Sequence, residues 1–236
     1  MRIQAILPYL ALALLAALAL FAYLPGLHGN FLFDDFANLP TLGAQGRIDN
    51  WPAFWRYITA SRNDPFGRPL TLLTFLLDAR DWPADPYPFK RTNLILHLLN
   101  GALLYALLSK LGQSLNVATR RARSAALFGC AMWLLHPLLV STTLYIVQRE
   151  AMLSATCVMA GLLLWMHGRA LLTAGSKRSG FCIVTLGLGG FALLGALATA
   201  TGLLLPFYAL LIEAIVLAPR RPLPPATTPR AYRVVM

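Results

Sequence analysis

Apolar segments long enough to cross a membrane recur along this chain, and they constrain its fold more than any other feature. Because an α-helix rises about 1.5 Å per residue, about twenty apolar residues cross a hydrocarbon core of about 30 Å. Hydrophobic residues make up 58% of the chain, which is more than soluble domains usually carry. We place six spans, at residues 5–24, 92–108, 125–147, 151–172, 181–197 and 202–217. The sequence therefore predicts an all-α polytopic membrane protein.

The basic residues gather on one side of these spans, which sets the expected orientation. Lys and Arg concentrate in the cytoplasmic loops of membrane proteins, and the formal net charge here is +11. The segments on that side contain no acidic residue, and their basic residues are Arg2, Lys110, Arg120, Arg121, Arg123, Arg169, Lys177, Arg178, Arg220, Arg221, Arg230 and Arg233. We therefore expect both termini in the cytoplasm, with residues 219–236 as a basic, proline-rich tail. The same charge on a soluble surface would favour nucleic-acid binding, which this placement argues against.

Residues 25–91 form the long polar loop, and the expected orientation places it outside the cytoplasm. The Asn50-Trp51-Pro52 sequence predicts a helix start. One face of that helix carries Trp51, Phe54, Trp55 and Ile58. Such a stripe is typical of a helix in the membrane interface, and the alternative is a packed helix in a small soluble loop domain. We expect residues 69–77 to form a second surface-lying helix.

Two adjacent carboxylates, Asp34 and Asp35, follow the first span and are flanked by Phe33 and Phe36. Two close carboxylates either share a metal ion or push their pKa values apart, so that one is available as a base. A divalent metal is therefore compatible with the pair but not required by it. The alternative is a solvated helix start just outside the membrane.

Polar side chains also lie inside the predicted spans. Asn93, His97 and Asn100 share one face of the second span because they are four and three residues apart. In membranes such groups either line a functional cavity or hydrogen-bond one helix to another. His136-Pro137 interrupts the third span, where proline predicts a kink or a break.

Three basic side chains fall at the expected outer level of the membrane: Arg68, Lys90 and Arg149. Cations at this level either bind an anionic lipid headgroup or extend to the interface without a ligand.

These motifs, in this order, resemble a known family. The residues that carry the resemblance are Phe31-Leu32-Phe33-Asp34-Asp35, Arg68-Pro69-Leu70-Thr71-Leu72-Leu73-Thr74-Phe75, Asn93-Leu94-Ile95-Leu96-His97-Leu98-Leu99-Asn100, His136-Pro137 and Arg149. Together they are similar to the multi-span part of the transmembrane and tetratricopeptide-repeat protein O-mannosyltransferases and their bacterial relatives. This family belongs to the GT-C class of glycosyltransferases. The resemblance covers about residues 31–153.

The resemblance implies a sugar donor on a polyprenyl phosphate and an acceptor hydroxyl on a protein or an envelope glycan. It implies that Asp34 or Asp35 acts as general base or positions the acceptor. Arg149 and Arg68 are then the candidates that stabilise the lipid-phosphate leaving group. It also implies a multi-pass protein of the bacterial inner (cytoplasmic) membrane that acts at the outer face.

We expect the acids and cations to line one cleft at the outer interface, with a mouth that opens sideways to lipid so that the polyprenyl tail can enter. The residues predicted to line it are Asp34 or Asp35, Arg68, Lys90, His97, His136 and Arg149.

The chain departs from the family in three respects. Lys90 stands where relatives usually carry a histidine, and residues 198–201, Ala-Thr-Ala-Thr, stand where they commonly carry a Ser-Lys motif. The family also has more spans, often followed by helical repeats. These departures leave an alternative: a non-catalytic or partial membrane subunit, or a truncated family member, that keeps the fold, binds the lipid carrier and works with a second membrane subunit.

Overall fold

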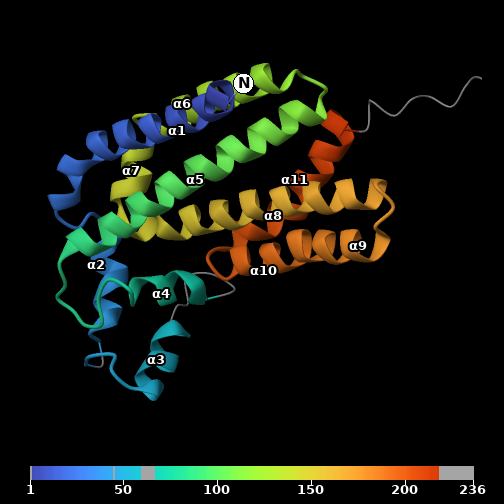
Figure 1. Cartoon of the computed structure of the whole chain (residues 1–236). Coiled ribbons are helices and arrows are strands. Elements are labelled where there is room, and N and C mark those ends of the chain that lie inside the picture. The colour runs from blue at the N-terminus through green and yellow to red at the C-terminus, as the bar shows by residue number, and fades with distance from the viewer. Residues whose placement is uncertain (1, 45, 60–66, 218–236) are drawn as a thin grey trace, which may run out of the picture.

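The computed structural model describes residues 2–44, 46–59 and 67–217, and it is helical (Figure 1). The described residues contain no strand and only one isolated bridge, between Ala44 and Gly46. The all-α prediction is confirmed. The predicted tail at residues 219–236 lies outside the described residues.

Five helical segments are long and apolar enough to cross a membrane, which identifies the chain as an integral membrane protein. They are Ile6–His28, Pro86–Ser114, Ile146–Thr173, Lys177–Ala196 and Ala200–Leu217. The first segment consists of α1 (Arg2–Tyr23) and the 3-10 turn η1 (Leu24–His28), the second of α5 (Pro86–Ser114), and the third of the 3-10 turn η3 (Ile146–Gln148) and α8 (Arg149–Thr173). The fourth segment consists of α9 (Lys177–Thr185), the π-helical turn η4 (Leu186–Gly190) and α10 (Phe191–Ala196). The fifth consists of the 3-10 turn η5 (Ala200–Leu204), α11 (Leu205–Leu211) and the π-helical turn η6 (Ile212–Leu217).

The segment expected to be the third span is divided. It forms α6 (Thr119–Leu134), which has 16 residues, and the short α7 (Leu139–Leu144). The break falls at His136-Pro137, as predicted, because proline lacks an N–H group and its ring clashes with the preceding turn. Residues 125–147 are therefore not one continuous span, although α6 runs alongside α1 and α5 (Figure 1).

The bundle is held together by close packing between neighbouring segments of the chain. Small residues let membrane helices approach each other closely. A Cβ atom added at Gly168 of α8 would lie 2.9 Å from the Gly180 carbonyl oxygen of α9, so the two backbones touch there. Large apolar side chains such as Leu14, Phe181 and Ile215 remain exposed on the outside of the bundle, where lipid would cover them.

The polar loop folds into short helices at one end of the bundle (Figure 1). They are α2 (Asp35–Asn38), η2 (Leu39–Leu42), α3 (Trp51–Ile58) and α4 (Pro69–Phe75). Their apolar core consists of Leu39, Leu42, Ile48, Ala53, Tyr57, Ile58 and Phe75, together with Phe89 of α5 and Ile146 of η3. This core attaches the loop to the ends of two membrane-spanning segments.

Helix α3 begins where the sequence predicted, because the Asn50 Oδ1 atom accepts a hydrogen bond from the Ala53 N–H group at 2.9 Å. It buries Ala53 and Tyr57 and exposes Trp51 and Trp55 on its opposite face. The helix is thus packed on one side and exposes aromatic rings on the other. The packed loop helix describes its buried face, and the interfacial helix describes its exposed face.

Candidate functional site

The two adjacent carboxylates have different surroundings. Asp35 is fully buried, and its two oxygens accept hydrogen bonds from the Leu32 and Val147 N–H groups, each at 3.0 Å. Burial raises the pKa of the Asp35 carboxyl, against the opposing effect of these backbone hydrogen bonds and of Lys90. Since Val147 lies 112 residues further along the chain, Asp35 ties the loop to the start of the α8 span.

Asp34, in contrast, is exposed. Its backbone N–H group donates a hydrogen bond to the Tyr145 hydroxyl at 2.9 Å. Desolvation raises the pKa of Tyr145, and the two nearby carboxylates raise it further, so the phenol stays protonated over the physiological range. Of the pair, Asp34 is therefore the carboxylate that a substrate can reach.

Phe33, which precedes this carboxylate, has an unusual backbone conformation. Its φ angle is +36°, in the left-handed region that costs a residue with a side chain about 1–2 kcal/mol. Its ring is 82% exposed and meets the Tyr145 ring edge-on, with 6.2 Å between centroids. Composition and periodicity gave no indication of this strain, which depends on the tertiary contacts of the turn.

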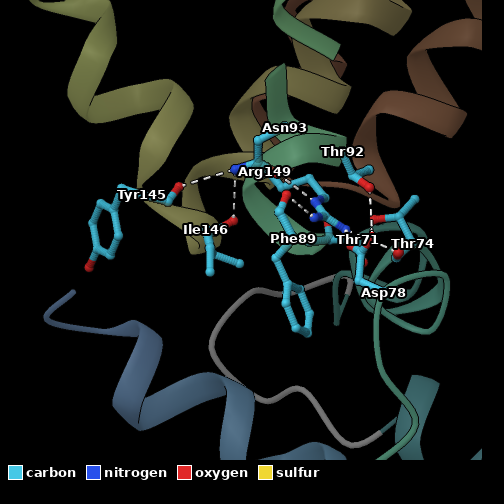
Figure 2. A network of polar contacts seen from close by, with 9 residues as sticks. All are labelled: Thr71, Thr74, Asp78, Phe89, Thr92, Asn93, Tyr145, Ile146 and Arg149. Atoms are coloured by element: carbon cyan, nitrogen blue, oxygen red, sulfur yellow. Dashed lines mark hydrogen bonds and ion pairs between the residues drawn. The ribbon is translucent and has the colours of Figure 1, made fainter. Parts of the chain in front are cut away.

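Arg149 is fully buried at the centre of a polar network (Figure 2). Its guanidinium donates to the Asn93 side-chain oxygen at 2.7 Å and to the carbonyl oxygens of Phe89 and Thr74 at 2.8 Å and 3.0 Å. It also forms an ion pair with the buried Asp78 at 2.6 Å. Arg149 thus joins α4, α5 and α8, and its side chain is occupied by the protein itself.

Asp78 is the member of this network that the sequence analysis did not identify. Its other oxygen accepts a hydrogen bond from the Thr92 hydroxyl at 2.6 Å (Figure 2). The available signal was an acidic residue just after the predicted loop helix at 69–77. That signal does not name a partner, because Asp78 and Arg149 meet only in the folded chain.

Lys90 and the histidines also have partners within the protein. The buried Lys90 ammonium donates to the Gly29 and Asn30 carbonyl oxygens at 2.8 Å and 2.9 Å. The buried His97 bonds the Leu134 carbonyl oxygen at 3.0 Å, where the break after α6 leaves that oxygen without its helical donor. His136 is exposed and accepts the Leu138 N–H group within the same turn, at 3.3 Å.

The polar face of α5 bonds neighbouring helices. Besides the Asn93 and His97 contacts, the Asn100 amide donates to the Met152 carbonyl oxygen of α8 at 3.0 Å. Asn100 also accepts a hydrogen bond from the Thr156 hydroxyl at 2.7 Å. Of the two roles considered for this face, the contacts support the one that connects helices.

Arg68 lies at a junction between the loop and the bundle. Its side chain, 14% exposed, forms an ion pair with Glu150 in the first turn of α8. The beginning of α4 is also fixed to the turn that follows α10, because the Leu70 N–H group donates to the Leu197 carbonyl oxygen at 2.9 Å. Within the described part of the chain, the buried Arg68 Nε atom has no hydrogen-bond partner.

A groove of about 300 Å³ has in its lining Ala151, the residue that follows Glu150 in α8. Residues of α8 from Ala151 to Met159 form one side of it, and the eight residue steps between them correspond to about 12 Å of helix. Its lining is largely apolar and consists of Leu104, Trp133, Ala151, Ser154, Ala155, Val158, Met159, Thr201 and Tyr208.

Two further hollows lie in the loop. One of about 380 Å³ is lined by residues that include Trp51 and Phe54 of α3, Leu73 of α4 and Leu77 just after α4, and one of about 120 Å³ lies beside Tyr57. None of these three hollows is lined by any of the seven predicted site residues. The structure brings most of those residues to the same end of the bundle but does not gather them around one of these hollows.

Metal ligation and similarity to other proteins add no further assignment. Across residues 2–44, 46–59 and 67–217, no group of three or more His, Cys, Asp or Glu side chains is placed to hold a metal ion. No protein-family model, curated protein or solved structure matches the chain. Any function must therefore be argued from the motifs and the geometry.

Proposed function

We propose that this protein is a membrane glycosyltransferase that moves a sugar from a polyprenyl-phosphate carrier to a hydroxyl group of a protein or an envelope glycan. The observation that carries the proposal is the division of the carboxylate pair. Asp35 is buried and bonded to the backbone, whereas Asp34 is exposed at the end of the bundle where the polar loop lies. One carboxylate thereby holds the site, and its neighbour is available as a base.

The proposed carrier site lies close to this base. Asp35 is bonded to Val147 and Arg68 is paired with Glu150, so the acid pair and the cation are attached to positions three residues apart. That separation is about 5 Å along a helix. The apolar groove along α8 starts at Ala151, next to Glu150. A lipid phosphate at Arg68 would thus have its sugar toward Asp34 and its chain in the groove.

The proposed reaction is a displacement at the anomeric carbon. Asp34 accepts the proton of the acceptor hydroxyl, the acceptor oxygen forms the new glycosidic bond, and the bond between the anomeric carbon and the phosphate oxygen breaks. The phosphate leaves with the electron pair, and Arg68 stabilises the negative charge that develops on it. Attack opposite to the leaving group inverts the anomeric configuration.

The proposal includes the arrangement in the membrane. We assign α6 as a short sixth span, the polar loop to the outer side, and both termini to the cytoplasm of a bacterial cell. The exposed Trp51 and Trp55 of α3 and Leu73 and Leu77 near α4 support a loop that rests on the outer leaflet, since indole rings favour the headgroup region.

The test is sugar transfer by the purified chain in liposomes, with radiolabelled polyprenyl-phosphate sugars and a mixture of envelope acceptors. Asp34→Asn should lower transfer at least a hundredfold, because general-base catalysis contributes about 10²- to 10⁴-fold. Asp81→Asn, which alters an exposed acid elsewhere in the loop, should transfer like wild type. Equal transfer by Asp34→Asn and wild type would remove Asp34 from the mechanism.

A second candidate function is a non-catalytic membrane subunit that binds the lipid carrier. The observation that favours it is the internal use of Lys90, His97 and Arg149, whose polar atoms bond to the protein itself. Sugar-transfer assays of the chain alone, and of the chain together with membrane proteins encoded next to it, distinguish the two candidate functions. Transfer by the chain alone excludes the subunit role.

A further inference from the structure

The turn that presents Phe33 is held from several directions. The Asp35 N–H group donates to the Leu32 carbonyl oxygen at 2.8 Å, and the Phe36 N–H group donates to the Phe33 carbonyl oxygen at 3.2 Å. The Asp35 side chain binds the Leu32 N–H group at 3.0 Å, and the Asp34 N–H group binds Tyr145. These contacts over-determine the turn, which is how an aromatic residue is kept at a φ angle of +36°.

Packing does not account for this conformation. The Phe33 ring is 82% exposed, and the aromatic contact that the structure gives it is a T-shaped one with the Tyr145 ring. Glycine would occupy the same backbone position without strain. Within the described residues, the fold therefore displays an aromatic ring that its contact with Tyr145 leaves largely exposed.

The surroundings of that face define the chemistry of its ligand. The exposed Asp34 carboxylate beside it accepts hydrogen bonds, and the Tyr145 hydroxyl both accepts and donates them. An aromatic face carries partial negative charge and attracts the polarised C–H groups of a ring stacked on it. A ligand with an apolar C–H face and hydroxyl groups at its edge matches both features, whereas a lipid chain offers nothing to the carboxylate.

We infer that Phe33 is the stacking platform for a pyranose ring, which it positions beside Asp34; this inference rests on the proposed sugar transfer. The ring belongs either to the donor or to a glycan acceptor, because both present the same chemistry. Phe33 is a positioning residue: it holds the sugar so that the hydroxyl group and the carboxylate meet.

The first experiment measures binding without transfer. Saturation-transfer NMR is recorded for the whole chain in nanodiscs with methyl glucopyranoside, methyl galactopyranoside and methyl mannopyranoside, which carry neither lipid nor phosphate. We expect saturation of the ring C–H protons of at least one of them, and at least a tenfold smaller signal with Phe33→Leu. Phe33→Tyr should stay within threefold of wild type, because it keeps the aromatic face.

The choice of leucine separates a sugar platform from a lipid contact, since leucine serves a lipid contact equally well but has no aromatic face. Phe33→Gly should also lose the signal while its melting temperature is no lower than that of wild type, because glycine relieves the strain. Phe36→Leu is the matched control: that ring is also exposed, at 59%, but belongs to the helical turn α2. It should bind the glycosides like wild type.

The second experiment assigns the ring to donor or acceptor by the KM that rises in Phe33→Leu. A rise of at least tenfold for the lipid-linked sugar marks the donor ring, and the same rise for the glycan acceptor marks the acceptor ring. Transfer without any dependence on Phe33 would overturn the platform and leave the proposed function standing. Glycoside binding that depends on Phe33, in a protein that transfers no sugar, would keep the platform and overturn the proposed function. A wild-type protein that saturates none of the glycosides, or a Phe33→Leu protein that matches wild type, would end the inference.

Discussion

Two arginines meet the start of α8 with the same charge and very different surroundings. Arg149 is fully buried, and its contacts come from Asn93, Phe89, Thr74 and Asp78. Arg68 is partly exposed, pairs with the partly exposed Glu150, and has a buried Nε atom without a partner in the described chain. The same contrast separates Asp35 from Asp34. We call Arg149, Asp35 and their partners the closed region, and Arg68 and Asp34 the open region. The closed region builds the site, and the open region is what a substrate can use.

The largest effect should come from opening the closed region. Arg149→Ala leaves the Asp78 carboxylate buried and unpaired, so we expect the free energy of unfolding to fall by about 3–5 kcal/mol. Thermal unfolding of the purified protein in detergent measures this change. Arg47→Ala, at an exposed position of the loop, is the control and should melt like wild type. If Arg149→Ala melts normally but no longer uses the donor, Arg149 belongs to the open region.

Substitutions of Asp35 and Asp34 should also differ in their effect on stability, with a smaller change in the free energy of unfolding than for Arg149. Asp35→Asn cannot accept both backbone N–H groups as a carboxylate does, so we expect a loss of about 1–3 kcal/mol in the free energy of unfolding. Asp34→Asn should stay within about 0.5 kcal/mol of wild type, as exposed substitutions usually do. Chemical unfolding and sugar transfer, measured on the same two preparations, check the division. Equal destabilisation by both substitutions would contradict it.

These paired differences show which features of the fold and the site can be predicted from the sequence alone. The break at Pro137 and the Asn50 cap of α3 follow from local chemistry, and five of the six expected spans follow from apolar length, so these features could be predicted. Asp34 and Asp35 are neighbours with the same side chain, and only the tertiary contact with Val147 distinguishes them. No local pattern contains that information.

The cations illustrate the same limit. Lys90 and Arg149 look in the sequence like Arg68, a basic residue at the membrane level. Their burial depends on the Gly29 carbonyl oxygen and on Asp78, which are far away along the chain. The sequence indicates that charged residues lie in the loop and at the ends of the neighbouring spans, but it could not tell which of them the protein uses for its own structure.

The stability of the closed region should also depend on pH. Because the pKa of Asp35 is raised in the folded protein, the native state binds this proton more tightly than the unfolded state. The resulting stabilisation is full below about pH 4 and is lost as the pH rises through the folded pKa. We expect the difference in melting temperature between wild type and Asp35→Asn to shrink as the pH rises from about 4 to 7. A difference that grows over this range would contradict the direction of the shift.

The smallest effect on stability should come from the open ion pair. Glu150→Gln removes a partly exposed partner of Arg68, and such pairs contribute about 0–1 kcal/mol. The melting temperature should therefore barely change. Because the substitution releases the guanidinium, the KM for the lipid-linked donor should fall or stay the same, whereas Arg68→Ala should raise it. A large loss of stability with Glu150→Gln would place this pair among the structural ones.

The groove offers a further way to test the open region without changing any charge. Ala155 lines the middle of the groove on α8, and Ala155→Phe would fill part of its volume of about 300 Å³. We expect the KM for the lipid-linked donor to rise at least tenfold, while a donor with a much shorter chain is affected less. Ala160→Phe, on the same helix but outside the groove lining, is the control for bulk in α8. An equal response to both donors would show that the chain does not lie in the groove.

The most direct test of the account is an experimental structure of the protein in nanodiscs with a polyprenyl phosphate. We expect the phosphate at the Arg68 guanidinium, the first isoprene units along Ala151, Ala155 and Val158 of α8, and Arg149 still paired with Asp78. A phosphate bound by Arg149, or a lipid chain that lies outside the groove, would contradict it.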